Sequence, residues 1–203
     1  MLAGPDWVEG GDAGSTVGTA QYTFGVGQIN SISGTLGGTG LVPDFEDMYI
    51  VRVTTPMAFQ MSLFGGNFDA QLFVFNITQA NEAFGLLAND NTPAGNSPVL
   101  TNLATDGTGA KISFPGVYAV AISAAGRYPI SLNGAIFNYT SPTEISGPDG
   151  PGGINPHIDW AGPGQAGSYQ IQTIGVGFYD TPSPGSGAVL GMGALLLARR
   201  RRR

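Results

Sequence analysis

Acidic and amide side chains gather at three places where the sequence predicts turns. These are Asp44, Glu46 and Asp47, then Asp69, and then the run Asn89-Asp90-Asn91. Oxygen ligands on loops are what Ca²⁺ prefers, with about six to eight at one site. The spacing does not match an EF-hand loop, so these residues form a calcium site only if the fold brings them to one edge. The alternative interpretation is solvated acids and Asx turns, which Asp and Asn form readily.

The single histidine, His157, lies two residues before Asp159. Such a pair could orient a base toward a serine. The sequence has no Gly-x-Ser-x-Gly nucleophile elbow, however, and it singles out no pair of acids for glycoside hydrolysis. We therefore expect a protein that is not an enzyme, with a small secreted hydrolase as the least favoured alternative.

Four aromatic residues could form a platform for sugar rings, because sugars stack on exposed aromatic faces. They are Trp7, Trp160, Tyr169 and Phe178. The other interpretation is that these rings pack in the core or at its edge. A calcium-binding or carbohydrate-binding module is therefore the alternative function that the sequence leaves open, with Ca²⁺ as the one candidate cofactor.

Composition excludes several classes of protein. There are no cysteines, which excludes disulfide scaffolds, zinc–thiolate sites and thiol nucleophiles. The chain has 14 acidic and 8 basic residues, and five of the basic residues are the arginines at its end. The remainder is strongly acidic and would repel phosphate backbones, so nucleic-acid binding is excluded.

The last part of the chain has three successive pieces. Pro182-Ser183-Pro184 comes first, and residues 185–198 then form an uncharged stretch rich in Gly, Ala and Leu. Five basic residues end the chain: Arg199, Arg200, Arg201, Arg202 and Arg203. As a helix, the apolar stretch would be about 21 Å long, and snorkelling arginines would let it just span a bilayer. The arginines lie where the positive-inside rule would keep them in the cytoplasm.

This arrangement resembles the PEP-CTERM class of bacterial sorting tails, with Ser183 in place of the central Glu of the motif. The resemblance implies a partner, an exosortase-type membrane transpeptidase that cleaves near Pro182-Ser183-Pro184. It also implies a transient place in the inner membrane through residues 185–198, and delivery to the cell surface or the outside. A plain membrane anchor and a structural helix are the alternatives.

Residues 1–20 carry no basic region followed by an apolar run, as a secretion signal would. We expect the signal to lie upstream of Met1 or to have been removed, with a cytoplasmic start as the alternative. We therefore divide the chain into an N-terminal segment (1–20), a folded domain (21–179) and a sorting tail (180–203).

The middle of the chain alternates apolar and polar residues with period two, which predicts β-strands. In 48–53, Tyr49, Val51 and Val53 share one face. Residues 71–77 are apolar on both faces, as a strand buried on both sides would be. Only residues 77–87 could hold a helical turn, and 141–167 form a long loop. The predicted fold is all-β, an antiparallel, jelly-roll-like sandwich followed by a short C-terminal hydrophobic helix.

The order of motifs in 29–135 resembles bacterial pre-peptidase C-terminal (PPC) domains. The motifs are SISGTLGG, DFEDMYIVRV, FDAQLFVFN, LANDNTP and FPGVYAVAISAAGRYPISL. The resemblance implies a non-catalytic β-sandwich on a secreted or surface protein, and it keeps an Asp at positions 69 and 90. Asp69 and Asp90, with Asp47, are therefore the candidate calcium ligands. We expect a structural or adhesive role at the cell surface or in an extracellular polysaccharide matrix.

Overall fold

The computed structural model describes residues 5–37 and 44–179, and in these ranges the chain is all-β, as predicted. Within these two ranges, the one helical element is a short 3-10 turn, η1 (Pro56–Ala58). No helix in this part of the chain is long and apolar enough to cross a membrane. The predicted hydrophobic helix at 185–198 and the sorting motif before it lie outside the described residues.

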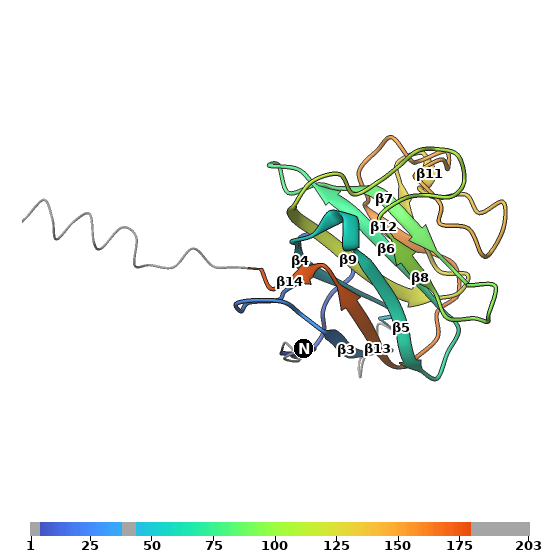
Figure 1. Ribbon diagram of the computed structural model, residues 1–203. Coiled ribbons are helices and arrows are strands. Elements are labelled where there is room, and N and C mark those ends of the chain that lie inside the picture. The colour runs from blue at the N-terminus through green and yellow to red at the C-terminus, as the bar shows by residue number, and fades with distance from the viewer. Residues whose placement is uncertain (1–4, 38–43, 180–203) are drawn as a thin grey trace, which may run out of the picture.

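The largest sheet has the strand order β14-β4-β9-β6-β7, and β2 pairs with β4 beside this path. Its strands are β2 (Gln21–Tyr22), β4 (Glu46–Val53), β6 (Ala70–Ile77), β7 (Ala83–Asn89), β9 (Gly116–Ala124) and β14 (Val176–Gly177). Strands β4, β9, β6 and β7 are antiparallel neighbours. We call this the main sheet, and Figure 1 shows a second sheet of β3, β13 and β5 packed against it.

The second sheet has the order β1-β3-β13-β5-β8. Its strands are β1 (Trp7–Val8), β3 (Ser31–Leu36), β5 (Gln60–Gly66), β8 (Val99–Thr101) and β13 (Gly167–Ile174). Two pairs differ from the predicted antiparallel pattern, because β1 is parallel to β3 and β2 is parallel to β4. Parallel pairing needs a long connection rather than a hairpin, and both of these two-residue strands reach their partners through long intervening segments.

The core between the two sheets follows from the alternation in the sequence. Tyr49, Val51 and Val53 share the inner face of β4, as predicted, and are fully buried. Ile32 and Ile171 meet them from the second sheet. Each such aliphatic side chain contributes about 1.5–3 kcal/mol when fully buried.

The outer face of the main sheet is also covered. A small third sheet and the segment leading into it pack over Phe73 and Phe75, which bury their rings against Phe137 and Trp160. This sheet consists of β10 (Tyr128–Ser131), β11 (Gly134–Ala135) and β12 (Asp159–Ala161). The prediction that 71–77 is buried on both faces is therefore confirmed for residues 72–75, each of which has 0% exposure.

The prediction of a helical turn in 77–87 is wrong. Most of this segment belongs to a β-hairpin, in which β7 pairs with β6 from Ile77↔Ala83 to Leu72↔Asn89. Asn81 makes the turn with a φ of 60°, a left-handed conformation that Asn tolerates better than most residues. Both faces of β7 are buried, so both carry apolar residues. Its sequence therefore lacks the period-two alternation of a strand with one exposed face.

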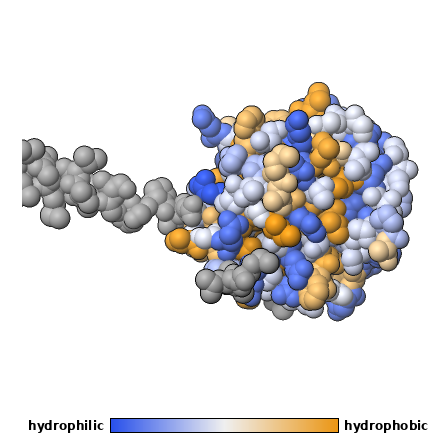
Figure 2. Space-filling model, in the orientation of Figure 1, coloured by the Kyte–Doolittle hydropathy of each residue, from blue (hydrophilic) through white to orange (hydrophobic). Residues whose placement is uncertain are grey.

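On the face drawn in Figure 2, apolar residues are interspersed with hydrophilic ones. Single exposed apolar side chains are normal on a folded protein.

Candidate metal centre

Asp69 and Asp90 lie at the same end of the β6–β7 hairpin. Asp69 directly precedes β6, and Asp90 directly follows β7. The strands are antiparallel, and Leu72 faces Asn89, so the start of one strand adjoins the end of the other. The negative charge of Asp69 raises the pKa of Asp90, which shows that the two carboxyl groups are close. Turns far apart in sequence therefore form one cluster.

Four oxygen atoms in this cluster are buried and have no hydrogen-bond partner among residues 5–37 and 44–179. They are Asp69 Oδ1, Gln71 Oε1, Asp90 Oδ1 and Asn91 Oδ1. The Gln71 side chain is only 5% exposed. A buried polar atom without a partner costs about 1–3 kcal/mol, so four such acceptors at one place need an explanation.

The remaining polar atoms of the cluster fix these oxygens in place. Asn91 Nδ2 donates to Asp90 Oδ2 over 3.1 Å, and Asn96 Nδ2 donates to Asp69 Oδ2 over 3.2 Å. The Gln71 side chain lies against the Asp90 carboxyl group and lowers its pKa. Each carboxylate thus uses one oxygen for an amide partner and keeps the other oxygen unbonded.

Burial is the main influence on both carboxyl groups. It raises the pKa of Asp69, against the lowering effect of its bond to Asn96. It also raises the pKa of Asp90, against the lowering effect of the Gln71 side chain. No positive charge is among the influences on either pKa. Among the described residues, no cationic side chain therefore offsets the repulsion between the two carboxylates.

This set of ligands suits a hard divalent cation. Two carboxylate oxygens and two amide oxygens are the ligand types that Ca²⁺ takes, and it completes six to eight positions with carbonyls and water. The set contains no nitrogen or sulfur ligand, so it is unlike the sites of zinc or copper. The four residues therefore fit Ca²⁺ by donor type and by the unmet bonding capacity of their oxygens.

Gln71 is the candidate ligand that sequence reasoning misses. It lies in the segment whose pattern predicts an apolar strand, yet it is two residues after Asp69. Residues two apart along a strand share one face, so this spacing was the available signal. Gln71 shares the outer face of β6 with Phe73 and Phe75, which pack under the third sheet.

Asp47 is not part of this cluster, although it was predicted as the third ligand. It pairs with Ile122, which in turn pairs with Leu72, so Asp47 lies two strands away from β6. It shares the inner face of β4 with Tyr49, whereas Gln71 is on the outer face of β6. The alternation of side chains along each strand therefore places Asp47 on the other side of the sheet.

Asp47 belongs instead to a second group of acids, with Glu9, Asp12 and Asp44. Carboxylate oxygens of Glu9, Asp12 and Asp47 lie within 4.8 Å of one another. Tyr169 donates a hydrogen bond to Asp47, and the hydroxyl groups of Tyr169 and Tyr49 are bonded to each other. We call these four acids the acid cluster.

The acid cluster holds protons at neutral pH. Burial, together with neighbouring negative charges, raises the pKa of Asp47 to about 8. Burial and the carboxyl group of Asp12 raise the pKa of Asp44 to about 7, while the hydrogen bond from Asp44 lowers the pKa of Asp12. Within the described chain, no buried oxygen of this cluster lacks a partner. It therefore differs from the cluster at Asp90, where the oxygens remain unbonded.

His157 and the predicted aromatic platform both lie mainly in the interior. His157 is buried between Phe75 and Trp160, and burial lowers its pKa to about 4. Trp160, Tyr169 and Phe178 are at most 5% exposed. Trp7 is half-buried, with its ring edge-on to Phe178. These four rings therefore do not form an exposed surface for sugars.

The comparisons with known proteins add no family. No protein-family model matches this chain, and no curated protein matches it in sequence. The proposals below therefore depend on the residues and on their arrangement.

Proposed function

We propose that this protein is an exported, non-catalytic β-sandwich module that binds one Ca²⁺ through Asp69, Gln71, Asp90 and Asn91. The observation that carries the proposal is the set of four buried oxygens around Asp90 that have no partner in the described residues. A bound cation would satisfy all four atoms and would offset the repulsion between the two carboxylates.

The charge of the site sets the expected affinity. With two carboxylates and two neutral amides, it resembles the weaker extracellular calcium sites, whose dissociation constants are about 10⁻⁴–10⁻³ M. Such a site would be filled outside the cell, where Ca²⁺ is abundant, rather than in the cytoplasm. The calcium site and an extracellular location therefore support each other.

The first experiment measures thermal unfolding of the full chain with and without Ca²⁺. At ten times its dissociation constant, a ligand of the native state adds about 1.4 kcal/mol to the free energy of unfolding. In a domain of this size that raises the melting temperature by roughly 3–6 °C. Mg²⁺ at the same concentration should give a smaller rise, because it demands a compact octahedral set of ligands.

Two matched variants locate the effect. Asp90→Asn keeps the shape of the side chain but removes one of the two charges, and it should abolish the calcium-dependent rise. Glu82→Gln removes a charge from an exposed residue at the other end of the same hairpin, and it should respond like the wild type. Calcium-dependent stabilisation that persists in Asp90→Asn, or that is absent from the wild type, would refute this site.

The sorting part of the proposal is supported by Pro182-Ser183-Pro184, the apolar stretch 185–198 and the basic run Arg199–Arg203. The expected partner is an exosortase-type membrane transpeptidase, and the expected destination is the cell surface or an extracellular polysaccharide matrix. There the domain would have a structural or adhesive role.

Removing residues 182–203 tests the sorting. The truncated protein should stay folded and should fail to reach the surface in its processed form, as measured by cell fractionation and intact mass. Replacing the five arginines with glutamine is the milder variant, and it should retain the fold while delaying processing. Surface delivery of the truncated chain, at the wild-type level and mass, would contradict the sorting role.

A further inference from the structure

The main sheet carries a hollow at the end opposite the candidate metal centre. Its volume is about 280 Å³, near the lower end for small-molecule sites. Its lining comes from β2, β4, β9, the end of β6, the β6–β7 turn and Tyr179. The lining residues are Tyr22, Ile50, Ile77, Thr78, Gln79, Asn81, Val117 and Tyr179.

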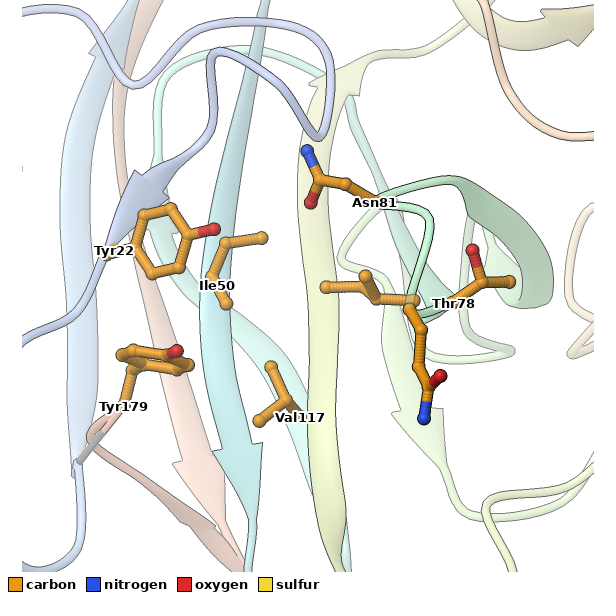
Figure 3. Close-up of a pocket in the computed structure, with 8 residues that line it drawn as sticks. Tyr22, Ile50, Thr78, Asn81, Val117 and Tyr179 are labelled. Atoms are coloured by element: carbon orange, nitrogen blue, oxygen red, sulfur yellow. The ribbon is translucent and has the colours of Figure 1, made fainter. Parts of the chain in front are cut away.

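Figure 3 shows how these side chains are arranged. The rings of Tyr22 and Tyr179 stand on one side, and Thr78 and Asn81 stand on the other. Ile50 and Val117 lie between them. The hollow therefore has an apolar floor, one aromatic wall and one polar wall.

Four polar side chains of the lining have free hydrogen-bonding capacity. Within the described residues, the side chains of Tyr22, Gln79, Asn81 and Tyr179 form no hydrogen bond, although the backbone N–H of Tyr179 donates to the Thr23 hydroxyl group. Together they offer two phenol hydroxyl groups and two carboxamides, which can both donate and accept. They are placed to bind several hydroxyl groups of one ligand.

The aromatic wall is held rigidly. Phe24 stacks on Tyr22 with ring centres 5.6 Å apart and an angle of 12° between the planes. Tyr179 packs edge-on against Tyr22 at 4.9 Å and against Phe24 at 5.8 Å. Rigid rings lose little entropy when a ligand binds, so this wall is organised in advance.

The polar wall is fixed by the hairpin turn. Asn81 adopts a φ of 60°, and its N–H donates to the carbonyl oxygen of Thr78 over 3.0 Å. The Thr78 hydroxyl group accepts a hydrogen bond from the Glu82 N–H. The turn therefore presents the amides of Gln79 and Asn81 from a defined backbone.

We infer that this hollow binds a neutral sugar residue of a glycan chain. A pyranose has an apolar face for an aromatic wall and a rim of hydroxyl groups for carboxamides and phenols. The lining has no Lys, Arg, Asp or Glu, so it has nothing to pair with a charged ligand. The chain is also acidic, which disfavours anionic polysaccharides.

A purely apolar ligand fits less well, because it would bury four polar groups without partners. The assignment does not depend on the calcium site, which uses the start of β6 rather than its end. The two can therefore be tested and can fail separately.

The experiment titrates the full chain with cellohexaose, mannohexaose and maltohexaose, and with oligogalacturonate as the anionic counterpart. Amide chemical shifts of the ¹⁵N-labelled protein report both affinity and location. At least one neutral probe should shift residues of the β6–β7 turn and of β2, with a dissociation constant between about 0.1 and 10 mM. Oligogalacturonate should bind at least tenfold more weakly.

Three variants remove one polar group each while preserving the backbone. Asn81→Gly keeps the left-handed turn, Gln79→Ala shortens an exposed side chain, and Tyr179→Phe keeps the ring. Each should weaken binding roughly 3- to 10-fold, the effect of one hydrogen bond. Gln172→Ala, an exposed glutamine on the second sheet, is the control and should bind like the wild type.

The inference is overturned if no neutral probe shifts these residues at 10 mM, or if the shifts map to another surface. It is equally overturned if all three lining variants bind as tightly as Gln172→Ala.

Discussion

At the scale of single residues, the two acidic groups show how burial gives the same side chain different chemistry. At Asp90, each carboxylate keeps one unbonded oxygen among amide neighbours, which suits a cation. At Asp47, the carboxyl group bonds a tyrosine and lies beside other acids, so it retains a proton instead. The difference lies in the partners, because both groups are desolvated.

The proton on Asp47 predicts how stability depends on pH. Its pKa is raised from 3.8 to about 8 in the folded protein, so between these values the folded state holds a proton that the unfolded chain has released. The free energy of unfolding therefore falls as pH rises from about 4 to 8, by up to roughly 5 kcal/mol from this group. Asp44, with a pKa of about 7, acts in the same direction over the lower part of the range.

Asp47→Asn should remove most of this decline, because asparagine resembles the protonated acid and still accepts the Tyr169 hydrogen bond. Urea unfolding at pH 5 and pH 8.5 measures it: the variant should be the more stable protein at pH 8.5, with a small difference at pH 5. Glu82→Gln, on an exposed turn, provides the matched control. Equal pH slopes in wild type and Asp47→Asn would show that Asp47 ionises normally.

At the scale of elements, strands with period-two alternation or with long apolar runs were predictable from the sequence. Residues 48–53 and 71–77 both lie within strands of the main sheet. β7 is buried on both faces like β6, but it was not predictable, because Ala83, Gly85, Ala88 and Asn89 are residue types that are depleted in strands. For the candidate site, the resemblance indicated Asp69 and Asp90. The sequence could not show that Gln71 joins these two residues and that Asp47 does not. Both outcomes depend on which face of the main sheet each side chain occupies.

At Gly85 in β7, side chains of the outer layer pack directly against the main sheet. A Cβ atom there would lie inside van der Waals contact with Ile136, and it would be 3.0 Å from Phe137 Cζ. Gly85→Ala should therefore lower the free energy of unfolding by about 1–3 kcal/mol, the usual cost of overpacking. Chemical denaturation measures the change.

Gly65 in β5 is the matched control for this substitution. A Cβ atom there would find its nearest neighbour, Gln170 Cβ, at 3.9 Å, which is ordinary contact. Gly65→Ala should change stability by less than about 0.5 kcal/mol. If both substitutions had the same effect, intrinsic strand preference rather than the outer layer would account for Gly85.

At the scale of the whole molecule, the main sheet separates two sites that should act independently. β6 has eight residues, and at about 3.3 Å per residue its ends are roughly 23 Å apart. The metal centre is at its start and the sugar pocket follows its end. This separation exceeds the screening length of about 8–10 Å at physiological salt, so bound Ca²⁺ should not alter the affinity for a neutral sugar by charge.

The independence is measurable in a two-by-two design, in which each site's variant is assayed for the other ligand. Asp90→Asn should bind a neutral hexasaccharide with the wild-type dissociation constant, within about twofold, and Asn81→Gly should keep the full calcium-dependent rise in melting temperature. Free-energy changes at sites more than 7–10 Å apart usually add within about 0.5 kcal/mol, so the double variant should lose the calcium response and bind sugar as weakly as Asn81→Gly alone. A large cross-effect would instead mean that the β6–β7 hairpin moves as one unit between its two ends. Ca²⁺ would then control glycan binding by ordering the hairpin rather than by charge.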